Sequence, residues 1–137
     1  MALVDQDAQA FDGVGTAYGL PRTDDVQKAA RKAAIREALL GAMEVPRQTC
    51  QVALEGVDAL VGLGDRCNPN LASDVAVGAH ALAAAVRGAW VNVLVNLKGL
   101  RDAELTASST DEGAAWLART DELERSIVAR IHAVVSP

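Results

Sequence analysis

The chain has 137 residues and a formal net charge of −5, with half of its residues hydrophobic and only 3% aromatic. We expect one domain over residues 1–137, since this length holds a single core. The acidic balance, the lack of a long basic run and the scarcity of aromatic side chains argue against nucleic-acid binding. Two cysteines do not form a disulfide framework, and no basic start precedes an apolar leader, so we expect a cytoplasmic protein.

Hydrophobic spacing predicts a first helix from residue 1 to Leu20-Pro21. Its apolar side chains recur every three or four residues, at Val4, Ala8, Phe11, Val14 and Tyr18. No Ser, Thr, Asp or Asn stands before its start as a cap. The helix ends there because the residue before a proline is pushed out of helical geometry.

A second and longer helix is predicted from Thr23-Asp24-Asp25 to about Gly62. Its acidic start suits the positive end of the helix dipole. Pro46 lies inside this helix, and its ring nitrogen cannot donate a hydrogen bond to the carbonyl of Ala42. We therefore expect a kink at Pro46.

The third predicted helix begins at Asn68-Pro69 and runs to about Lys98, before Gly99. It is apolar nearly all round, so we expect it to be central and buried. Residues 75–97 are long enough to cross a membrane, but Arg87 near mid-span would cost roughly 2.5–3.5 kcal/mol. We therefore expect a core helix and no membrane contact.

A polar loop over residues 101–109 is expected to precede the last helix. Ser109 and Glu112 have the spacing of a capping box, and the helix should continue to about Val135. Its inward residues are predicted to be Leu117, Leu123, Ile127, Ile131 and Val134. No segment alternates convincingly as a strand, so the sequence predicts an all-α helical bundle.

The polar side chains of the third helix share one stripe with small residues. Spacings of three and four align Asp74, Gly78, Ala81, Ala85, Gly88, Asn92 and Asn96. Small side chains let another helix or a ligand approach the backbone closely. From the pattern alone, bonds to neighbouring backbone and an ion pair for Asp74 explain these polar groups better than a binding site does.

Five segments, in the same order and at similar intervals, resemble the formimidoyltetrahydrofolate cyclodeaminase and methenyltetrahydrofolate cyclohydrolase family of folate one-carbon metabolism. They cover about residues 3–102 and are Asp5-Gln-Asp-Ala-Gln-Ala-Phe11, Leu20-Pro21, Glu44-Val45-Pro46, Asn68-Pro-Asn-Leu-Ala-Ser-Asp74 and Asn92-Val-Leu-Val-Asn-Leu-Lys98. The resemblance implies an all-helical domain, commonly dimeric, that acts on a tetrahydrofolate derivative without a further cofactor. Members usually carry a Gly-Gly-Gly-Ser stretch nearer the N-terminus, which this sequence lacks, so we expect an N-terminally incomplete domain.

The chemistry of this family explains the residue types. Both reactions pass through an amidinium bridge between N5 and N10 of the folate, which the cyclodeaminase closes with loss of ammonia and the cyclohydrolase opens with water. A carboxylate beside that cation stabilises its charge and exchanges a proton. The resemblance makes Asp7 the first candidate and Asp74 the second, with both facing one pocket. The candidates for binding the folate are Asn68, Asn70, Asn92, Asn96 and Glu44.

We therefore expect an enzyme that hydrolyses 5,10-methenyltetrahydrofolate to 10-formyltetrahydrofolate or deaminates 5-formimidoyltetrahydrofolate to the methenyl form. The lack of an attached formiminotransferase domain favours the hydrolase. A homodimer is expected, because one copy does not easily cover helix faces made of small residues. The alternative is a non-catalytic helical dimerisation module derived from such an enzyme. His80 and His132 have no partner at metal-ligand spacing, so no metal site is expected.

Overall fold

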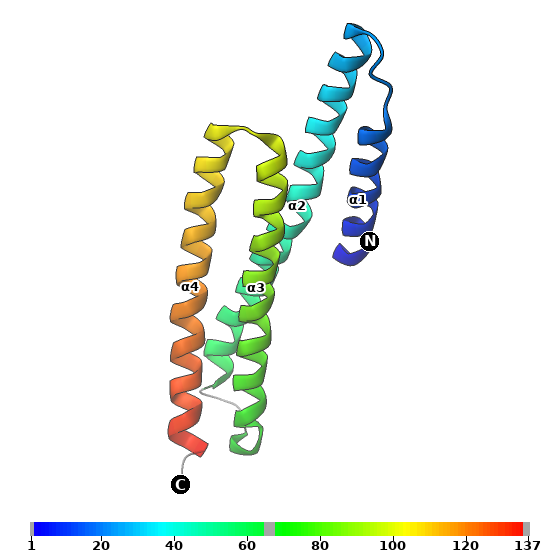
Figure 1. The fold of residues 1–137 in the computed structure, drawn as a ribbon. Coiled ribbons are helices and arrows are strands. Elements are labelled where there is room, and N and C mark those ends of the chain that lie inside the picture. Colours follow the sequence, from blue (N-terminus) through cyan, green and yellow to red (C-terminus); the bar gives the residue numbers. More distant parts are fainter. Residues whose placement is uncertain (1, 65–67, 136–137) are drawn as a thin grey trace.

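The structure, a computed structural model, describes residues 2–64 and 68–135. Within these ranges it contains four α-helices, one 3-10 turn and no strand. The elements are α1 (Leu3–Gly19), α2 (Asp25–Gly64), η1 (Pro69–Leu71), α3 (Ala72–Leu100) and α4 (Ala103–Val135). Helices α2, α3 and α4 form an antiparallel bundle, and α1 packs on the N-terminal half of α2, on the side away from α4 (Figure 1). The predicted all-α bundle is confirmed.

The first two helices begin and end close to where the sequence predicts. Leu20 follows the last residue of α1 in an extended conformation. The carboxylate of Asp5 accepts a hydrogen bond from the N–H of Ala2 at 3.3 Å, so Asp5 helps to start α1. Asp24 caps α2, because its Oδ1 accepts a hydrogen bond from the N–H of Gln27 at 2.7 Å. Helix α2 continues without interruption through Pro46.

The apolar stripe predicted for α1 is only partly buried. Ala17 is buried and Val14 is half-buried, whereas Val4 and Phe11 are exposed, with Phe11 at 77% of its maximal accessibility. Helix α1 packs mainly on α2, so within the described residues Val4 and Phe11 are left uncovered.

The start of α3 differs from the prediction by one turn. Asn68 does act as a cap: its Oδ1 accepts a hydrogen bond from the N–H of Asn70 at 3.0 Å. This cap opens the 3-10 turn η1, however, and α3 itself begins at Ala72.

The predicted polar loop over residues 101–109 is wrong, because α4 already begins at Ala103. Asp102 supplies the cap, since its Oδ1 accepts a hydrogen bond from the N–H of Leu105 at 3.0 Å. Hydrogen bonds from Leu105 and from the Arg36 guanidinium hold the pKa of Asp102 below its ordinary value. Ser109 is buried inside α4 and does not cap its start.

Small side chains let α2 and α3 pack closely. Each of three leucines lies over a glycine of the opposite helix, in the pairs Leu82 with Gly56, Leu60 with Gly78 and Leu39 with Gly99. Cys50 is fully buried, and its thiol donates to the carbonyl of Val86 at 3.5 Å. Burial raises the pKa of the Cys50 thiol to about 11, so this group stays protonated at neutral pH.

The contact between α3 and α4 is built around two tryptophans. Trp90 of α3 lies directly over Gly113, where the ring would collide with any side chain. Trp116 of α4 meets Trp90 edge to face, with ring centroids 6.5 Å apart. Gly113 is thus required here for the close approach of Trp90.

Ion pairs link the outer sides of α3 and α4. The Arg87 guanidinium donates to Asp121 at 2.7 Å and to Glu124 at 2.6 Å, and His80 Nδ1 lies 2.7 Å from Glu124. Partial burial disfavours ionised Glu124, but the bonds from Arg87 and His80 outweigh it and hold the pKa of Glu124 below its ordinary value. The ion pairs of Arg87 therefore help to hold α3 against α4.

Helix α3 is central, but one of its faces is open. It contacts both α2 and α4, and Val75, Ala79, Val86, Val93 and Leu97 are buried in those contacts. The stripe of small residues was expected to be buried, yet Ala81, Ala85, Gly88 and Asn92 are exposed. The neighbouring Val77, Val91 and Val95 are 66%, 56% and 64% exposed. Within the described residues α3 packs mainly against α2 and α4, which leaves this side uncovered.

By length and composition alone, α3 could cross a membrane, and 33% of its most apolar window is buried in the structure. Core helices of soluble proteins satisfy the same criterion. Arg87, in the middle of α3, pairs with two carboxylates of α4, and such a charged cluster is costly in hydrocarbon.

Candidate functional site

The contacts between α2 and α3 define which residues lie at the same level of the bundle. Because the helices are antiparallel, each step toward the C-terminus of α3 is a step toward the N-terminus of α2. Asn96 contacts Ala42, and Leu82 contacts Gly56. This register places Asn92 level with Pro46.

The contact between α1 and α2 places Asp7 at the same level. The Arg31 guanidinium donates two hydrogen bonds, at 3.0 and 3.3 Å, to the carbonyl of Tyr18 near the end of α1. The two helices run antiparallel (Figure 1). Asp7 precedes Tyr18 by eleven residues, so it lies level with about Ala42, where Asn96 meets α2.

The predicted site residues therefore divide into two groups. Asp7, Glu44, Asn92 and Asn96 lie near the level of Pro46, while Asn68, Asn70 and Asp74 lie at the other end of α3. Asp74 and Asn96 are separated by 22 positions, which corresponds to about 33 Å along a helix. One chain therefore does not hold Asp7 and Asp74 in one pocket.

Asn96 compensates for the hydrogen bond that Pro46 removes from α2. The carbonyl of Ala42 would accept from the N–H of residue 46 in a regular helix, and proline has no such group. Instead, Asn96 Nδ2 donates to the Ala42 carbonyl at 3.4 Å and to the carbonyl of Asn92 at 3.0 Å. Both amide hydrogens are thus used, and in the described parts of the chain nothing donates to the side-chain oxygen of Asn96.

Asp7 and Asn92 are the two members of this level with free side chains. Both are exposed. Within residues 2–64 and 68–135, neither side chain forms a hydrogen bond or an ion pair. The Asp7 carboxylate can therefore accept a proton, and the Asn92 amide can both donate and accept a hydrogen bond.

Glu44 is engaged on the side of α2 that faces α4. Its carboxylate accepts from Arg47 at 3.0 Å, and Arg47 also binds Glu112 of α4 through contacts of 2.7–3.1 Å. The hydrogen bonds that Arg47 donates to Glu112 are the main cause of its raised pKa. The Arg47 guanidinium also lies 5.9 Å from the ring centroid of Trp116. Sequence reasoning did not connect Arg47 with Glu112, because the two residues are far apart in the chain.

Two hollows in the surface lie away from the predicted residues. A groove of about 1420 Å³ separates the N-terminal half of α2 from the turn between α3 and α4. A hollow of about 520 Å³ between α2 and α4 is lined by Gln51, Glu55, Asp58, Trp116 and Arg119, among others. None of the seven predicted site residues lines either one. Nowhere in the described parts of the chain do three or more His, Cys, Asp or Glu side chains gather as metal ligands.

Comparison with known proteins identifies the family. The profile of the Formiminotransferase-cyclodeaminase family matches residues 1–115. The chain is 37% identical to a methenyltetrahydrofolate cyclohydrolase of Methylorubrum extorquens, over 98% of this chain and 64% of the relative. It is also 37% identical to the formimidoyltransferase-cyclodeaminase of Rattus norvegicus, over 74% of this chain and 19% of that protein. The chain belongs to the formiminotransferase-cyclodeaminase family, as its motifs predict.

A solved structure has the same fold. The crystal structure of formiminotetrahydrofolate cyclodeaminase from Thermotoga maritima superimposes with a TM-score of 0.69 at 25% identity. The match covers 97% of this chain and 60% of that one. The chain thus spans about two thirds or less of the length of these relatives.

The pairing of Asn96 with the Pro46 gap leads to a prediction for stability. Asn96→Ala should cost about 1 kcal/mol in the wild-type chain, because the Ala42 carbonyl loses its donor. In a Pro46→Ala chain the N–H of residue 46 becomes the donor, so the same change should cost at least about 0.5 kcal/mol less. Urea unfolding of the four chains measures this difference. Asn92→Ala, the control, should cost the same in both backgrounds, and equal costs for Asn96→Ala would refute the pairing.

Proposed function

We propose that this chain is a folate one-carbon enzyme that hydrolyses 5,10-methenyltetrahydrofolate to 10-formyltetrahydrofolate. The observation that carries the proposal is the extent of the similarity to the Methylorubrum extorquens cyclohydrolase. That match extends over 98% of this chain, whereas the matches to the formimidoyltransferase-cyclodeaminases extend over 74% at about the same identity. The segment beyond the shorter matches thus resembles the cyclohydrolase.

The proposed reaction adds water to the carbon that bridges N5 and N10. The Asp7 carboxylate stabilises the cationic amidinium and accepts a proton from water as its oxygen attacks that carbon. The bond from the carbon to N5 then breaks as N5 takes the proton held by Asp7. The hydroxyl group of the adduct loses its remaining proton to solvent, which leaves a formyl group on N10. Asp7 suits this role because its carboxylate is exposed and forms no bond within the described residues.

Asn92 and Asn96 are proposed to bind an edge of the pterin. The free amide of Asn92 offers a donor and an acceptor, and Asn96 offers its side-chain oxygen. Glu44 is held by Arg47 on the α4 side of α2, so a role in binding requires the folate to reach around α2. Asn68 and Asn70 are proposed to act with Asp74, at the far end of α3.

The deamination of 5-formimidoyltetrahydrofolate is a second candidate function. The similarity to the Thermotoga maritima structure, which is named as a cyclodeaminase, favours it. The same carboxylate would then return a proton to the departing ammonia. Ammonia released from the formimidoyl compound, with no loss of the methenyl compound, would establish this alternative.

A second copy of the chain is proposed to cover the open face of α3. Val77, Val91 and Val95 form an exposed apolar row beside the stripe of small residues. Apolar surface of this kind commonly marks an interface. Two-fold packing is the most common arrangement of identical chains, and it buries the same face on both copies.

A two-fold dimer would also complete the site. If two α3 helices pack antiparallel along the stripe, with the axis near its midpoint at Ala85, residue 74 of one copy lies opposite residue 96 of the other. The partner subunit's Asp74 would then approach Asn92 and Asn96, level with Asp7. This arrangement explains how Asp7 and Asp74, which lie at levels about 33 Å apart along the bundle of one chain, could serve one pocket.

The proposed role of Asp7 predicts a large loss of rate in Asp7→Asn. This change keeps the shape and removes the proton acceptor, so kcat should fall by about 10²–10⁴-fold with KM little changed. The loss of methenyl absorbance measures both. Asp12→Asn alters another exposed carboxylate of α1 and should keep the wild-type rate. A wild-type rate in Asp7→Asn would refute the role, and no turnover by the wild-type chain would favour the non-catalytic dimerisation module.

A site shared between two copies predicts recovery of activity on mixing two inactive chains. Asp7→Asn and Asp74→Asn should each be inactive alone. In a mixed dimer one site carries both substitutions and the other neither, so an equal mixture should regain about a quarter of the wild-type rate. A site contained in one chain would give no recovery. Light scattering of each chain controls for loss of the dimer.

A further inference from the structure

The groove between α2 and the α3–α4 turn is strongly basic. It is lined by seven of the thirteen Lys and Arg residues of the chain, and Asp102 is the only acidic residue among the lining residues. The seven are Arg22, Lys28, Arg31, Lys32, Arg36, Lys98 and Arg101. The chain as a whole carries a net charge of −5, so the groove is a local positive patch on an acidic protein.

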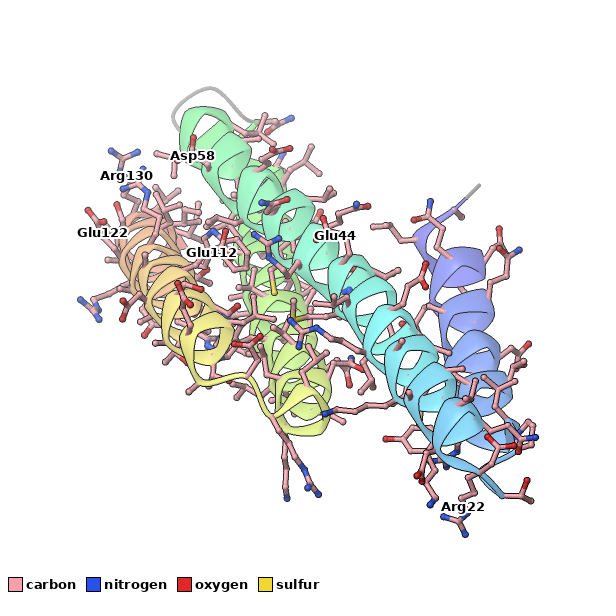
Figure 2. All side chains as sticks on the ribbon, turned by 90° about the horizontal axis from the view of Figure 1, so that it is seen from above. Arg22, Glu44, Asp58, Glu112, Glu122 and Arg130 are labelled. Atoms are coloured by element: carbon pink, nitrogen blue, oxygen red, sulfur yellow. The ribbon has the colours of Figure 1, made fainter. Side chains whose placement is uncertain are left out.

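Only some of these cations are satisfied by other groups of the chain. Lys28 pairs with Asp25 at 2.9 Å, Arg36 pairs with Asp102 at 2.8 Å, and Arg31 binds the carbonyl of Tyr18. Within the described residues, no ion pair or hydrogen bond engages the other four, which are Arg22, Lys32, Lys98 and Arg101. Arg22 extends from the connection between α1 and α2 into solvent (Figure 2).

The cations on α2 form a regular row. Lys28, Lys32 and Arg36 are four residues apart, so they share one face at steps of about 6 Å. Lys28 and Arg36 each already pair with one carboxylate of the chain. Lys32 between them has no such partner within the described residues, so an anion in the groove would supply the missing counter-charge. Alternate side chains of an extended peptide point to the same side and lie about 6.6–6.8 Å apart. Carboxylates at every second position of such a peptide therefore match this row.

The size and lining of the groove favour a peptide over a small anion. Pockets for small ligands usually have volumes of about 300–1,000 Å³, and this groove has about 1420 Å³. Its lining also includes Ile35 and Leu39, which offer apolar contact to a backbone or to intervening side chains. A single phosphate ion is too small to contact all three cations of the row on α2.

We propose that this groove binds an extended acidic segment of a partner protein. Carboxylates at alternate positions lie along the row of Lys28, Lys32 and Arg36 on one wall. Lys32, which has no partner within the described residues, pairs with one of them, and Lys98 and Arg101 hold the segment from the opposite wall. The groove is not lined by Asp7, Asn92 or Asn96. Binding of such a segment is therefore independent of the folate reaction.

A labelled peptide of five Glu-Ser repeats tests the proposal by fluorescence anisotropy with the whole chain. Binding should saturate and should weaken as salt rises from about 50 to 200 mM. The triple variant Lys32→Gln, Lys98→Gln, Arg101→Asn should weaken binding at least about tenfold. Asparagine is chosen at residue 101 because Arg101 has a φ of 53°, a conformation that asparagine tolerates well.

The matched control is Arg119→Gln, Arg125→Gln, Arg130→Gln, which removes the same charge from α4 outside the groove. It should leave binding within about twofold of wild type. An equal loss in both triple variants, or no binding at all, would overturn the proposal. Displacement of the peptide by tripolyphosphate at equal charge concentration would also overturn the proposal, because the groove would then bind a small anion. Tighter binding of a hexathymidylate would overturn it in favour of a nucleic acid. Displacement by 5-formyltetrahydrofolate would overturn it by assigning the groove to the folate site.

Discussion

Helices α2 and α3 approach so closely that a side chain of each bonds to the backbone of the other. The Cys50 thiol of α2 donates to the Val86 carbonyl, and the Asn96 amide of α3 donates to the Ala42 carbonyl. Small residues make this approach possible, and the two bonds fix the register of the helices. Because of this register, the backbone gap at Pro46 faces Asn96, and the candidate residues Asn92 and Asn96 lie level with Asp7 of α1.

The open side of α3 is the second constraint on this chain. Helices α2 and α4 cover two sides of α3, with leucines over glycines on one side and the Trp90–Gly113 contact on the other. The third side carries exposed valines next to the stripe of small residues. The same geometry separates Asp74 from Asp7 within one chain. A second copy would thus both cover apolar surface and bring the two carboxylates together.

Local signals predicted much of the fold, and long-range contacts supplied the rest. Leu20-Pro21 and Asp24 mark helix ends through backbone geometry and capping, which depend on neighbouring residues alone. The start of α4 was missed because Asp102 caps a helix whose first turns are rich in Thr and Ser, as in a loop. Periodicity placed Asp74 and Asn96 on one face, but it does not say whether another helix covers that face. Nor does it bring two residues 22 positions apart into one pocket. The motifs predicted the family, whereas the pairing of Asn96 with Ala42 required the structure.

The folate is proposed to bind beside Asn92 and Asn96 at the level of Pro46. Nuclear magnetic resonance of the side-chain amides tests this binding directly. The ligand is 5-formyltetrahydrofolate, which has no bridge between N5 and N10 and therefore does not undergo the ring-opening reaction. The amide signals of Asn92 and Asn96 should shift and saturate together. Those of Gln51, in the hollow between α2 and α4, should stay in place. Shifts at Gln51 without shifts at Asn92 and Asn96 would contradict the account.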